Sequence, residues 1–381
     1  MPTYLDNAAT SFPKPEVVYE AVDYYMREIG VSAGRGAYQR ALKADNLVYR
    51  ARKNLARLFN VGDISRIIFT INVTEALNLV LKGILQEGDH VITTHMEHNA
   101  VWRPLKVMEQ QGKITLTAIE CPEGRAPDSE EFRKAIRQET RLVVMTHASN
   151  VTGTFMPVKE VGEICRGQKI PLLVDSAQTA GVYPLDVNEL NIDLLAFTGH
   201  KGLLGPTGTG GLYIAPGIEV SPLKEGGTGG ESMLEHMPDH LPDRFEAGTL
   251  NLAGIAGLGA GAGYILEQGV ERFQEHKQNL TSRALQKLKS VPKIEVYGPG
   301  DAEKQAGVVS FNLKDFAPED VAYALDEKYG IMVRAGLHCS PQGHRCLGTE
   351  TRGAARIGLG YFNTEEEIDR LCSALIEIQS L

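Results

Sequence analysis

The sequence contains few of the features that mark secreted, membrane-spanning or nucleic-acid-binding proteins. Only 5 of its 381 residues are cysteines, and their odd number and irregular spacing exclude a disulfide framework. No basic stretch followed by an apolar core opens the chain, and the longest uncharged apolar run, at 252–266, is short for a membrane span. Lysine and arginine number 39 against 48 acids, giving a net charge of −9, and they form no clustered basic face. We therefore expect a cytoplasmic protein that binds neither membrane nor nucleic acid.

Glycine, in contrast, is abundant, with 40 among 381 residues, against an average of roughly 7%. The glycines follow no fixed period, which excludes a collagen-like chain, and they are mixed with apolar residues, which argues against disorder. One group surrounds Lys201 and predicts a backbone that passes close to a ligand; its members are Gly199, Gly202, Gly205, Gly208, Gly210 and Gly211. A second group lies in a helix-like run and predicts a close-packing surface; its members are Gly254, Gly257, Gly259, Gly261 and Gly263.

Short apolar runs alternate with helical periodicity from about residue 16 to 265. The run at 142–145 is apolar without alternation, as in a strand that is buried on both faces. Residues 45–59 carry an apolar stripe with helical spacing. This order predicts an α/β fold with a mostly parallel sheet covered by helices on both faces, with strands at 67–70, 90–93, 114–119, 141–146, 171–175, 193–198 and 211–214.

The pattern changes after about residue 266. Long charged helices are predicted at 267–289 and 318–329, the second with Pro318 at its start and Gly330 just past its end. Strands are predicted between and after them, at 294–297, 308–313 and 331–334. We therefore predict a large domain over residues 16–265 and a small α+β domain that is discontinuous and built from residues 1–15 and 266–381.

The clearest chemical motif is Phe-Thr-Gly-His-Lys-Gly at 197–202. Lys201 follows a predicted strand end and sits among small residues, at the edge of an open sheet where ligands bind. A lysine in a confined site can lose its proton and form a Schiff base with an aldehyde. The alternative, a solvated surface lysine, agrees less well with the flanking Thr198, His200 and glycines.

Other predicted strand ends also carry polar residues. Asp175 and Gln178 follow an apolar run, and a carboxylate there needs a partner such as a protonated pyridine nitrogen, unless it caps the next helix. Thr74 starts a helix, where it either binds an anion together with free N–H groups or forms a plain N-cap. His98 follows the next strand and either stacks on a planar ring or has a structural role.

These residues occur in the chain order that pyridoxal phosphate enzymes of the aminotransferase-like fold require. Further motifs are Tyr-Leu-Asp-Asn-Ala-Ala-Thr at 4–10, Ser-Asn-Val-Thr-Gly at 149–153 and Gly-His-Lys at 199–201. The sequence thus resembles the class V aminotransferases, and more narrowly the cysteine desulfurases and selenocysteine lyases, over nearly its whole length. The resemblance implies a fold-type-I transferase that depends on pyridoxal 5′-phosphate, with a seven-stranded sheet and a homodimeric assembly.

The resemblance also implies roles for individual residues. Lys201 would hold pyridoxal phosphate and remove the α-proton of the substrate, Asp175 would keep the ring nitrogen protonated, and His98 would stack on the ring. The phenolic oxygen and the phosphate would be bound by a larger set: Gln178, Asn150, Val73, Thr74, Thr198, His200 and, reaching over from the other subunit, Thr249. Arg356 would grip the substrate carboxylate, near Asn7 and Ala8. No metal is expected.

The segment Arg-Ala-Gly-Leu-His-Cys-Ser at 334–340 distinguishes a desulfurase from an aminotransferase. A cysteine beside a histidine and near an arginine can be a thiolate at neutral pH, hence a nucleophile. In the family that the sequence resembles, this thiolate, here Cys339, takes sulfur from L-cysteine as a persulfide and passes it to an acceptor protein or thiol, as in iron–sulfur cluster biogenesis. The SUF-like group has Gly-His-His-Cys-Ala, whereas this chain has Leu337 and Ser340, and Gly358 replaces a serine that is common after the arginine.

Several alternatives stay open at this point. Cys339 could be a small buried hydrophobe, and Arg356 could form a surface ion pair. A zinc site on a non-catalytic sulfur or zinc carrier is a further alternative, with the candidate ligands His338, Cys339, His344 and Cys346. A selenocysteine lyase or another class V aminotransferase-type enzyme is the nearest alternative function. The remaining cysteines are predicted to be packing residues: Cys121, Cys165 and Cys372.

Overall fold

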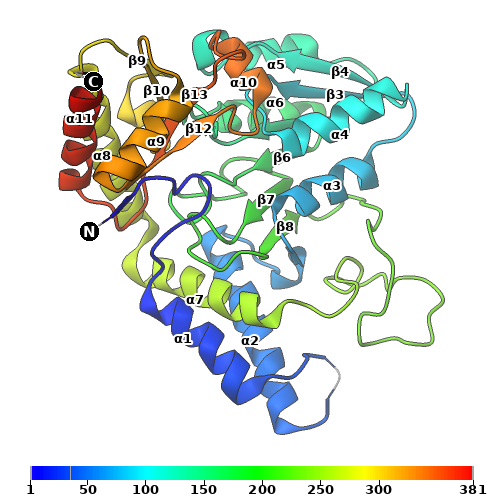
Figure 1. The fold of residues 1–381 in the computed structure, drawn as a ribbon. Helices are drawn as coiled ribbons and strands as arrows, with labels where there is room; N and C mark the ends of the chain where they lie inside the picture. Colours follow the sequence, from blue (N-terminus) through cyan, green and yellow to red (C-terminus); the bar gives the residue numbers. More distant parts are fainter. Residues whose placement is uncertain (1, 35, 380–381) are drawn as a thin grey trace.

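The computed structural model describes residues 2–34 and 36–379, and a seven-stranded sheet forms its centre (Figure 1). The strand order is β2-β8-β7-β6-β5-β3-β4. All neighbouring strands are parallel except β8, which is antiparallel to β2 and β7. This confirms the predicted mostly parallel sheet. The strands are β2 (Ile67–Thr70), β3 (Asp89–Thr94), β4 (Ile114–Ile119), β5 (Thr140–Thr146), β6 (Leu172–Asp175), β7 (Leu194–Thr198) and β8 (Gly210–Ile214).

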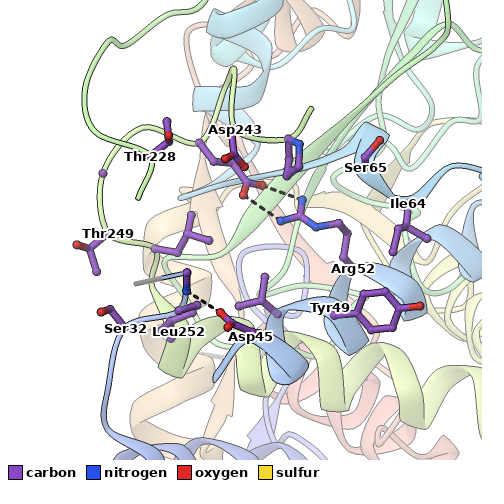
Figure 2. A pocket seen from close by; sticks show the side chains of 17 residues that line it. Ser32, Asp45, Tyr49, Arg52, Ile64, Ser65, Thr228, Asp243, Thr249 and Leu252 are labelled. Atoms are coloured by element: carbon purple, nitrogen blue, oxygen red, sulfur yellow. Dashed lines mark hydrogen bonds and ion pairs between the residues drawn. The ribbon is translucent and has the colours of Figure 1, made fainter. Parts of the chain in front are cut away.

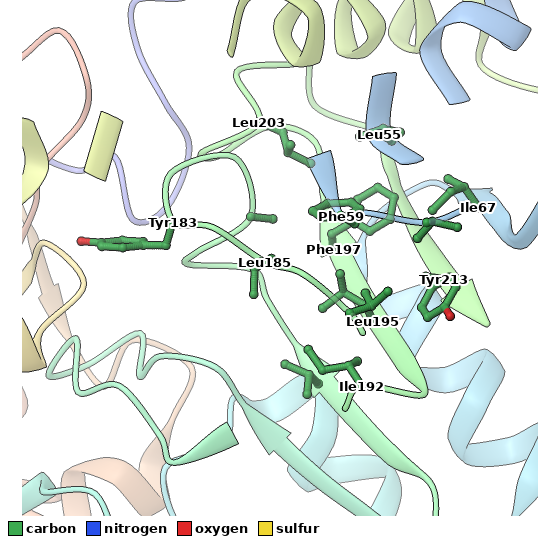
Figure 3. Packing of buried hydrophobic residues seen from close by; sticks show 14 of the residues in the cluster. Leu55, Phe59, Ile67, Tyr183, Leu185, Ile192, Leu195, Phe197, Leu203 and Tyr213 are labelled. Atoms are coloured by element: carbon green, nitrogen blue, oxygen red, sulfur yellow. The ribbon is translucent and has the colours of Figure 1, made fainter. Parts of the chain in front are cut away.

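Helices cover both faces of this sheet because successive strand residues enter two different hydrophobic layers. In β6, Leu172 and Val174 pack in one layer and Leu173 packs in the other. Figure 3 shows part of the first layer, where the rings of Phe59 and Phe197 lie 5.1 Å apart. The helices are α1 (Glu16–Tyr24), which continues as a π-helical turn (Tyr25–Ile29), α2 (Gln39–Leu58), α3 (Val73–Ile84), α4 (Asn99–Gln110), α5 (Ser129–Ala135), α6 (Val158–Gln168) and α7 (Leu252–Gln268).

Glycines allow α7 to approach its neighbours closely. A Cβ atom on Gly259 would lie 2.7 Å from the Cβ of Ala51 in α2, which confirms the predicted close-packing surface. The glycines around Lys201 have the same role: a Cβ on Gly202 would lie 2.5 Å from the carbonyl oxygen of Ala180. The expectation that the backbone around Lys201 passes close to a ligand stays a prediction.

A second sheet and its helices lie beside the first, near both chain ends (Figure 1). The sheet is antiparallel, in the order β12-β13-β10-β9, and Leu5 belongs to the same hydrophobic cluster as residues of its helices. On this ground we propose that residues 1–15 and 266–381 form the small domain and 16–265 the large one. The elements are β1 (Thr3–Tyr4), paired with β11 (Ile331–Met332), then α8 (Val270–Lys289), β9 (Ile294–Tyr297), β10 (Val308–Leu313), α9 (Pro318–Tyr329), β12 (Arg334–Gly336), α10 (Pro341–Cys346), β13 (Ala354–Gly358) and α11 (Glu365–Ile378).

Three predicted boundaries differ from the structure. The helix predicted at 267–289 is divided at Gly269, whose φ of 85° is outside the helical range, so that α7 ends and α8 begins there. Helix α2 starts at Gln39, six residues before the predicted start. The strand predicted at 331–334 becomes β11 and β12, because Ile331 pairs with β1 while Arg334 pairs with β13. No helix within the described ranges is both long and apolar enough to cross a membrane.

Candidate active site

The carboxyl ends of two neighbouring strands carry the central pair of polar residues. Asp175 is the last residue of β6, and Lys201 follows the end of β7 by three residues. The strands are parallel, with Asp175 in register with Ala196, so that both side chains belong to the same sheet edge. Burial lowers the pKa of Lys201 to about 8, with a further contribution from Arg356. About a tenth of the amine is therefore unprotonated at pH 7, far more than for an ordinary lysine, and a nucleophile for an aldehyde must be unprotonated.

Asp175 is a buried carboxylate without a cationic partner among the described residues. Its side chain is 3% exposed and accepts one hydrogen bond, from the Ala177 N–H at 2.9 Å. Burial raises the pKa of this carboxyl. A buried carboxylate with one donor is stabilised by a further N–H group, above all a charged one. The site can therefore take a cationic heteroaromatic nitrogen. The bond to Ala177 also means that the carboxylate closes a tight turn.

The start of α3 supplies backbone donors beside these residues. Asn72 is the N-cap, accepting from the Glu75 N–H at 2.9 Å, and Val73 and Thr74 form the first turn. The alternative of Thr74 as the N-cap is therefore wrong. His200 has a buried Nδ1 atom that lacks a hydrogen-bond partner in the part of the chain described. Thr198 ends β7 with its side chain buried. Such donors suit an anion.

His98 is held in one tautomer by the start of α4. Its Nδ1 accepts a hydrogen bond from the Ala100 N–H at 3.0 Å, so the ring proton resides on Nε2. Burial, followed by the charge of Lys201, lowers the pKa of His98 to about 4, and the ring is therefore neutral at pH 7. Thr74, His98 and Cys339 line one open cavity of about 740 Å³ between α3 and α4.

Cys339 lies on an exposed turn after β12, and this turn is hydrogen-bonded to the start of α4. The backbone of both His338 and Cys339 is left-handed, with φ of 50° and 59°. The Asn99 N–H donates to the carbonyl oxygen of Cys339 at 2.8 Å, and Nη2 of Arg334 lies 3.6 Å from its Sγ. A guanidinium at a thiol stabilises negative charge on sulfur. Because the thiol is exposed, the interpretation of Cys339 as a buried packing residue is wrong.

The arginine predicted for the substrate is buried rather than on the surface. Arg356 is 1% exposed; its Nη1 donates to the Asn150 carbonyl oxygen and its Nη2 to Oδ1 of Asp6, both at 2.9 Å. The alternative of a surface ion pair is therefore wrong. Its buried Nε has no partner among the residues that the structure describes and is available to a carboxylate. Nδ2 of Asn150 donates to the His338 carbonyl oxygen at 2.6 Å, linking Arg356 to the Cys339 turn.

The N-terminal segment contacts the residues of the site. The side-chain amide of Gln178 donates to the Ala8 carbonyl oxygen at 3.2 Å. Nδ2 of Asn7 donates to Oδ1 of Asn363 at 3.0 Å, and Asn7 and Lys201 line one small cavity. Contacts and shared cavities therefore bring the predicted residues that follow β2, β3, β5, β6 and β7 together with the Cys339 turn and the amino terminus.

The two histidines near Cys339 bind each other. Nδ1 of His338 lies 3.1 Å from Nε2 of His344, and Nδ1 of His344 lies 2.8 Å from Oγ1 of Thr349. Within the described ranges no group of three or more His, Cys, Asp or Glu side chains is arranged to hold a metal ion. Cys121, Cys165 and Cys372 are buried, in agreement with packing roles.

Thr249 is the predicted site residue that this chain does not bring to Lys201. It lines a separate cavity of about 360 Å³ with residues of α2 and of the segment before α7 (Figure 2). In that cavity Arg52 and Glu246 form a buried bidentate ion pair, at 2.8 and 2.9 Å. Glu246 also accepts from the Phe69 N–H at 2.7 Å, so the pair anchors the segment before Thr249 to β2.

We expect Arg52→Met to destabilise the protein, because the carboxylate of Glu246 would stay buried without its cation. The expected loss is about 3–5 kcal/mol in the free energy of unfolding, measured by urea denaturation at pH 7. Replacing exposed Arg50 of the same helix by methionine is the control and should change little. Equal effects of the two substitutions would contradict a stabilising role for the ion pair.

Sequence reasoning missed Glu97, Asp6 and Lys277. Glu97 precedes His98, and burial raises its pKa to about 8; its carbonyl oxygen accepts from Oγ of Ser340 at 2.9 Å, next to Cys339. The position of Glu97 directly before His98 was the sequence feature that could have indicated its role. Asp6, within the motif at 4–10, pairs with Arg356. Lys277 lies in a helix rich in charged residues, where its sequence neighbours give no sign that it is buried.

The order of the central sheet, with a lysine and an aspartate at its carboxyl edge, defines a fold-type-I transferase. The sequence model described as Aminotransferase class-V matches residues 3–371. The chain therefore belongs to the class-V aminotransferase family.

Named relatives extend over nearly the whole chain. A protein of Methanothermobacter thermautotrophicus named "Probable cysteine desulfurase" is 38% identical over 384 residues, covering 99% of this chain and 95% of the relative. A "Cysteine desulfurase" of Escherichia coli O157:H7 is 34% identical, covering 99% and 93%. The apo structure of a cysteine desulfurase from Thermococcus onnurineus NA1 is 34% identical and has a TM-score of 0.94, covering 100% of this chain and 95% of that one.

Proposed function

We propose that this protein is a pyridoxal 5′-phosphate-dependent cysteine desulfurase, which converts L-cysteine to L-alanine and transfers the sulfur to Cys339. The observation that carries the proposal is the exposed Cys339 thiol, which has Arg334 at 3.6 Å and shares one cavity with His98 and Thr74. An aminotransferase has no use for a nucleophile there. The relatives named as cysteine desulfurases support the same function.

The residues of the site fit pyridoxal phosphate. In the described part of the chain Asp175 has no cationic ion-pair partner, as a carboxylate that receives a pyridinium N–H should. The unpartnered Nδ1 of His200 and the first turn of α3 suit the phosphate. When bound, the cofactor supplies an electron sink for the carbanion at the substrate Cα. Lys201 would hold its aldehyde carbon, Asn150 and Gln178 its phenolic oxygen, and Val73, Thr74, Thr198 and His200 its phosphate.

The remaining steps of the reaction use side chains of the protein itself. Arg356, near Asn7 and Ala8, would bind the substrate carboxylate, with Nε as its free donor. The unprotonated Lys201 amine would take the α-proton. The Nδ1 atom of His98 accepts a hydrogen bond from the Ala100 N–H, which fixes the ring. His98 would stack this neutral ring on the cofactor. Burial of this neutral ring avoids a positive charge close to Lys201 and to the protonated pyridine.

Cys339 carries out the sulfur transfer. Its thiolate would attack the sulfur of the substrate, so that an S–S bond forms while the C–S bond breaks, and the electron pair of that bond returns to the carbon skeleton. Protonation of this carbon gives alanine, and the product on the enzyme is a persulfide. Arg334 would stabilise the thiolate before the attack. An acceptor protein or thiol then removes the persulfide sulfur.

The second subunit completes the proposed site. Thr249 lies in a cavity away from Lys201, which is consistent with a homodimer in which each Thr249 reaches the phosphate of the partner. Selenocysteine lyase is the alternative function, because the two reactions differ only in the atom that Cys339 attacks.

We expect purified enzyme to release alanine and sulfide from L-cysteine when a thiol is supplied as acceptor. L-Cysteine, L-selenocysteine, L-cysteine sulfinate and L-alanine should be compared at pH 8 by measuring alanine together with sulfide, selenide or sulfite. The highest kcat/KM with L-cysteine supports the proposal. A kcat/KM at least about 100-fold higher with selenocysteine, equivalent to about 2.7 kcal/mol of transition-state binding, would identify a selenocysteine lyase instead.

A further inference from the structure

Lys277 is a buried lysine that the proposed mechanism does not use. It lies in α8 with only 8% of its surface exposed. Among the described residues no carboxylate forms an ion pair with its amine. Buried lysines are normally paired, because the charge is costly away from water. A buried lysine that has no ion-pair partner among the described residues and lies next to a reactive lysine therefore indicates a functional role.

The backbone directs this lysine toward Lys201. Its side chain passes over Gly307, where a Cβ atom would lie 2.2 Å from Cε of Lys277 and 2.7 Å from its Cγ. Gly307 also has a φ of 66°, so the position suits glycine on two grounds. Beyond it, Lys277 and Lys201 line the same cavity of about 30 Å³, together with Asn7, Phe273 and Tyr361. This volume holds no more than two or three waters, so solvent between the two amines is scarce.

Two amines on one confined cavity cannot both be protonated without repulsion. The other charged groups around Lys201 partly oppose one another: Asp175 from β6 and Asp6 favour its protonated form, while Arg356 from β13 and Arg334 from β12 disfavour it. Among the described residues no acid lines the cavity that Lys201 shares with Lys277 of α8, so no carboxylate there offsets a positive charge on either amine. A neighbouring cation is a known way to keep a nucleophilic lysine unprotonated.

We propose that Lys277 is a positioning residue for the chemistry of Lys201, whose unprotonated form it favours by placing a second amine, without an ion-pair partner among the described residues, on their shared cavity. This inference rests on the proposed function only in taking Lys201 as the reactive lysine. In agreement with the geometry, burial and then the charge of Lys201 lower the pKa of Lys277 to about 8. Because like charges disfavour protonation on both sides, removal of Lys277 raises the pKa of Lys201.

The test is the pH dependence of Lys201 acylation in the full-length protein after the cofactor has been removed with hydroxylamine. Trace acetic anhydride is added between pH 6 and 10, and the Lys201 peptide is quantified by mass spectrometry. Lys277→Met should raise the midpoint by about one pH unit, so that Lys201 reacts about tenfold more slowly at pH 7. Lys277→Arg, which keeps the charge, should stay within a few tenths of a unit of the wild type. Lys287→Met, which removes a partly exposed lysine of α8, is the control for loss of any lysine.

A second variant tests the same coupling from the other side. Because the interaction is reciprocal, Lys201→Met should raise the midpoint of Lys277 acylation by a similar amount. An unchanged Lys201 midpoint in Lys277→Met, or equal midpoints in Lys277→Met and Lys277→Arg, would overturn the inference. Acylation requires neither cofactor nor substrate, so a protein that fails to desulfurate cysteine but shows the shift would refute the proposed function alone.

Discussion

Lys201→Ala is expected to abolish desulfuration and to leave the purified protein colourless. The variant loses both the amine that would hold the cofactor and the base that would take the α-proton, so kcat/KM for L-cysteine should fall by at least about 10⁴-fold. Alanine formation and the visible absorbance of bound pyridoxal phosphate after gel filtration measure the two losses separately.

The stability of this variant provides the control. The amine of Lys201 is partly buried, and burial lowers its pKa to about 8, so the native state gains little from the charge. We therefore expect the free energy of unfolding to be unchanged or higher in Lys201→Ala. Alanine at exposed Lys134 of α5 should change neither colour nor activity. Retention of covalent cofactor by Lys201→Ala, detected after borohydride reduction, would contradict the assignment of Lys201.

Cys339→Ser should keep the cofactor and lose the sulfur transfer. A serine hydroxyl fits the same turn but does not act as a thiolate, and we expect sulfide release from L-cysteine to fall by at least about 10³-fold. The backbone bonds that fasten this turn to α4 involve the main chain of residue 339, so they survive the substitution. The visible spectrum should therefore match that of the wild type.

Cys346→Ser is the matched control for this variant. Cys346 ends α10, seven residues beyond Cys339, is partly buried, and burial raises the pKa of its thiol, so it lacks the exposure and the guanidinium contact of Cys339. Activity within about twofold of the wild type is expected for Cys346→Ser. Full desulfurase activity in Cys339→Ser would show that the persulfide does not form at this residue.

The central sheet could be predicted because its strands are buried on both faces. Runs such as Leu-Val-Val-Met at 142–145 are typical of strands buried on both faces, and both hydrophobic layers of the structure contain residues of this run. The division at Gly269 was harder to predict, because α7 and α8 are both helical and a single glycine in such a run is usually tolerated. The strand pairing changes at Val333, from β1 before this residue to β13 after it. This change was hard to predict because β1 lies more than 300 residues away in the sequence.

The site residues that the sequence itself indicates are those in which chemistry and position coincide in one motif. Asp175 and Lys201 each follow an apolar strand, and the structure places both at one sheet edge. The resemblance, rather than spacing, indicated Asn150 and Arg356, and their mutual hydrogen bond joins residues that are 206 positions apart. Asp6 and Lys277 were missed because their importance comes from tertiary neighbours: Asp6 occupies part of the Arg356 guanidinium, and Lys277 reaches the Lys201 cavity across Gly307.

The most direct test of the proposed desulfurase activity is the mass of the Cys339 peptide after reaction with L-cysteine. The enzyme should be incubated briefly with limiting substrate without a thiol acceptor, alkylated, digested and examined by mass spectrometry, with alanine quantified in parallel. A Cys339 peptide that carries one additional sulfur atom, in an amount equal to the alanine formed, is the predicted result. Alanine formed in stoichiometric amount while the Cys339 peptide carries no additional sulfur would contradict it.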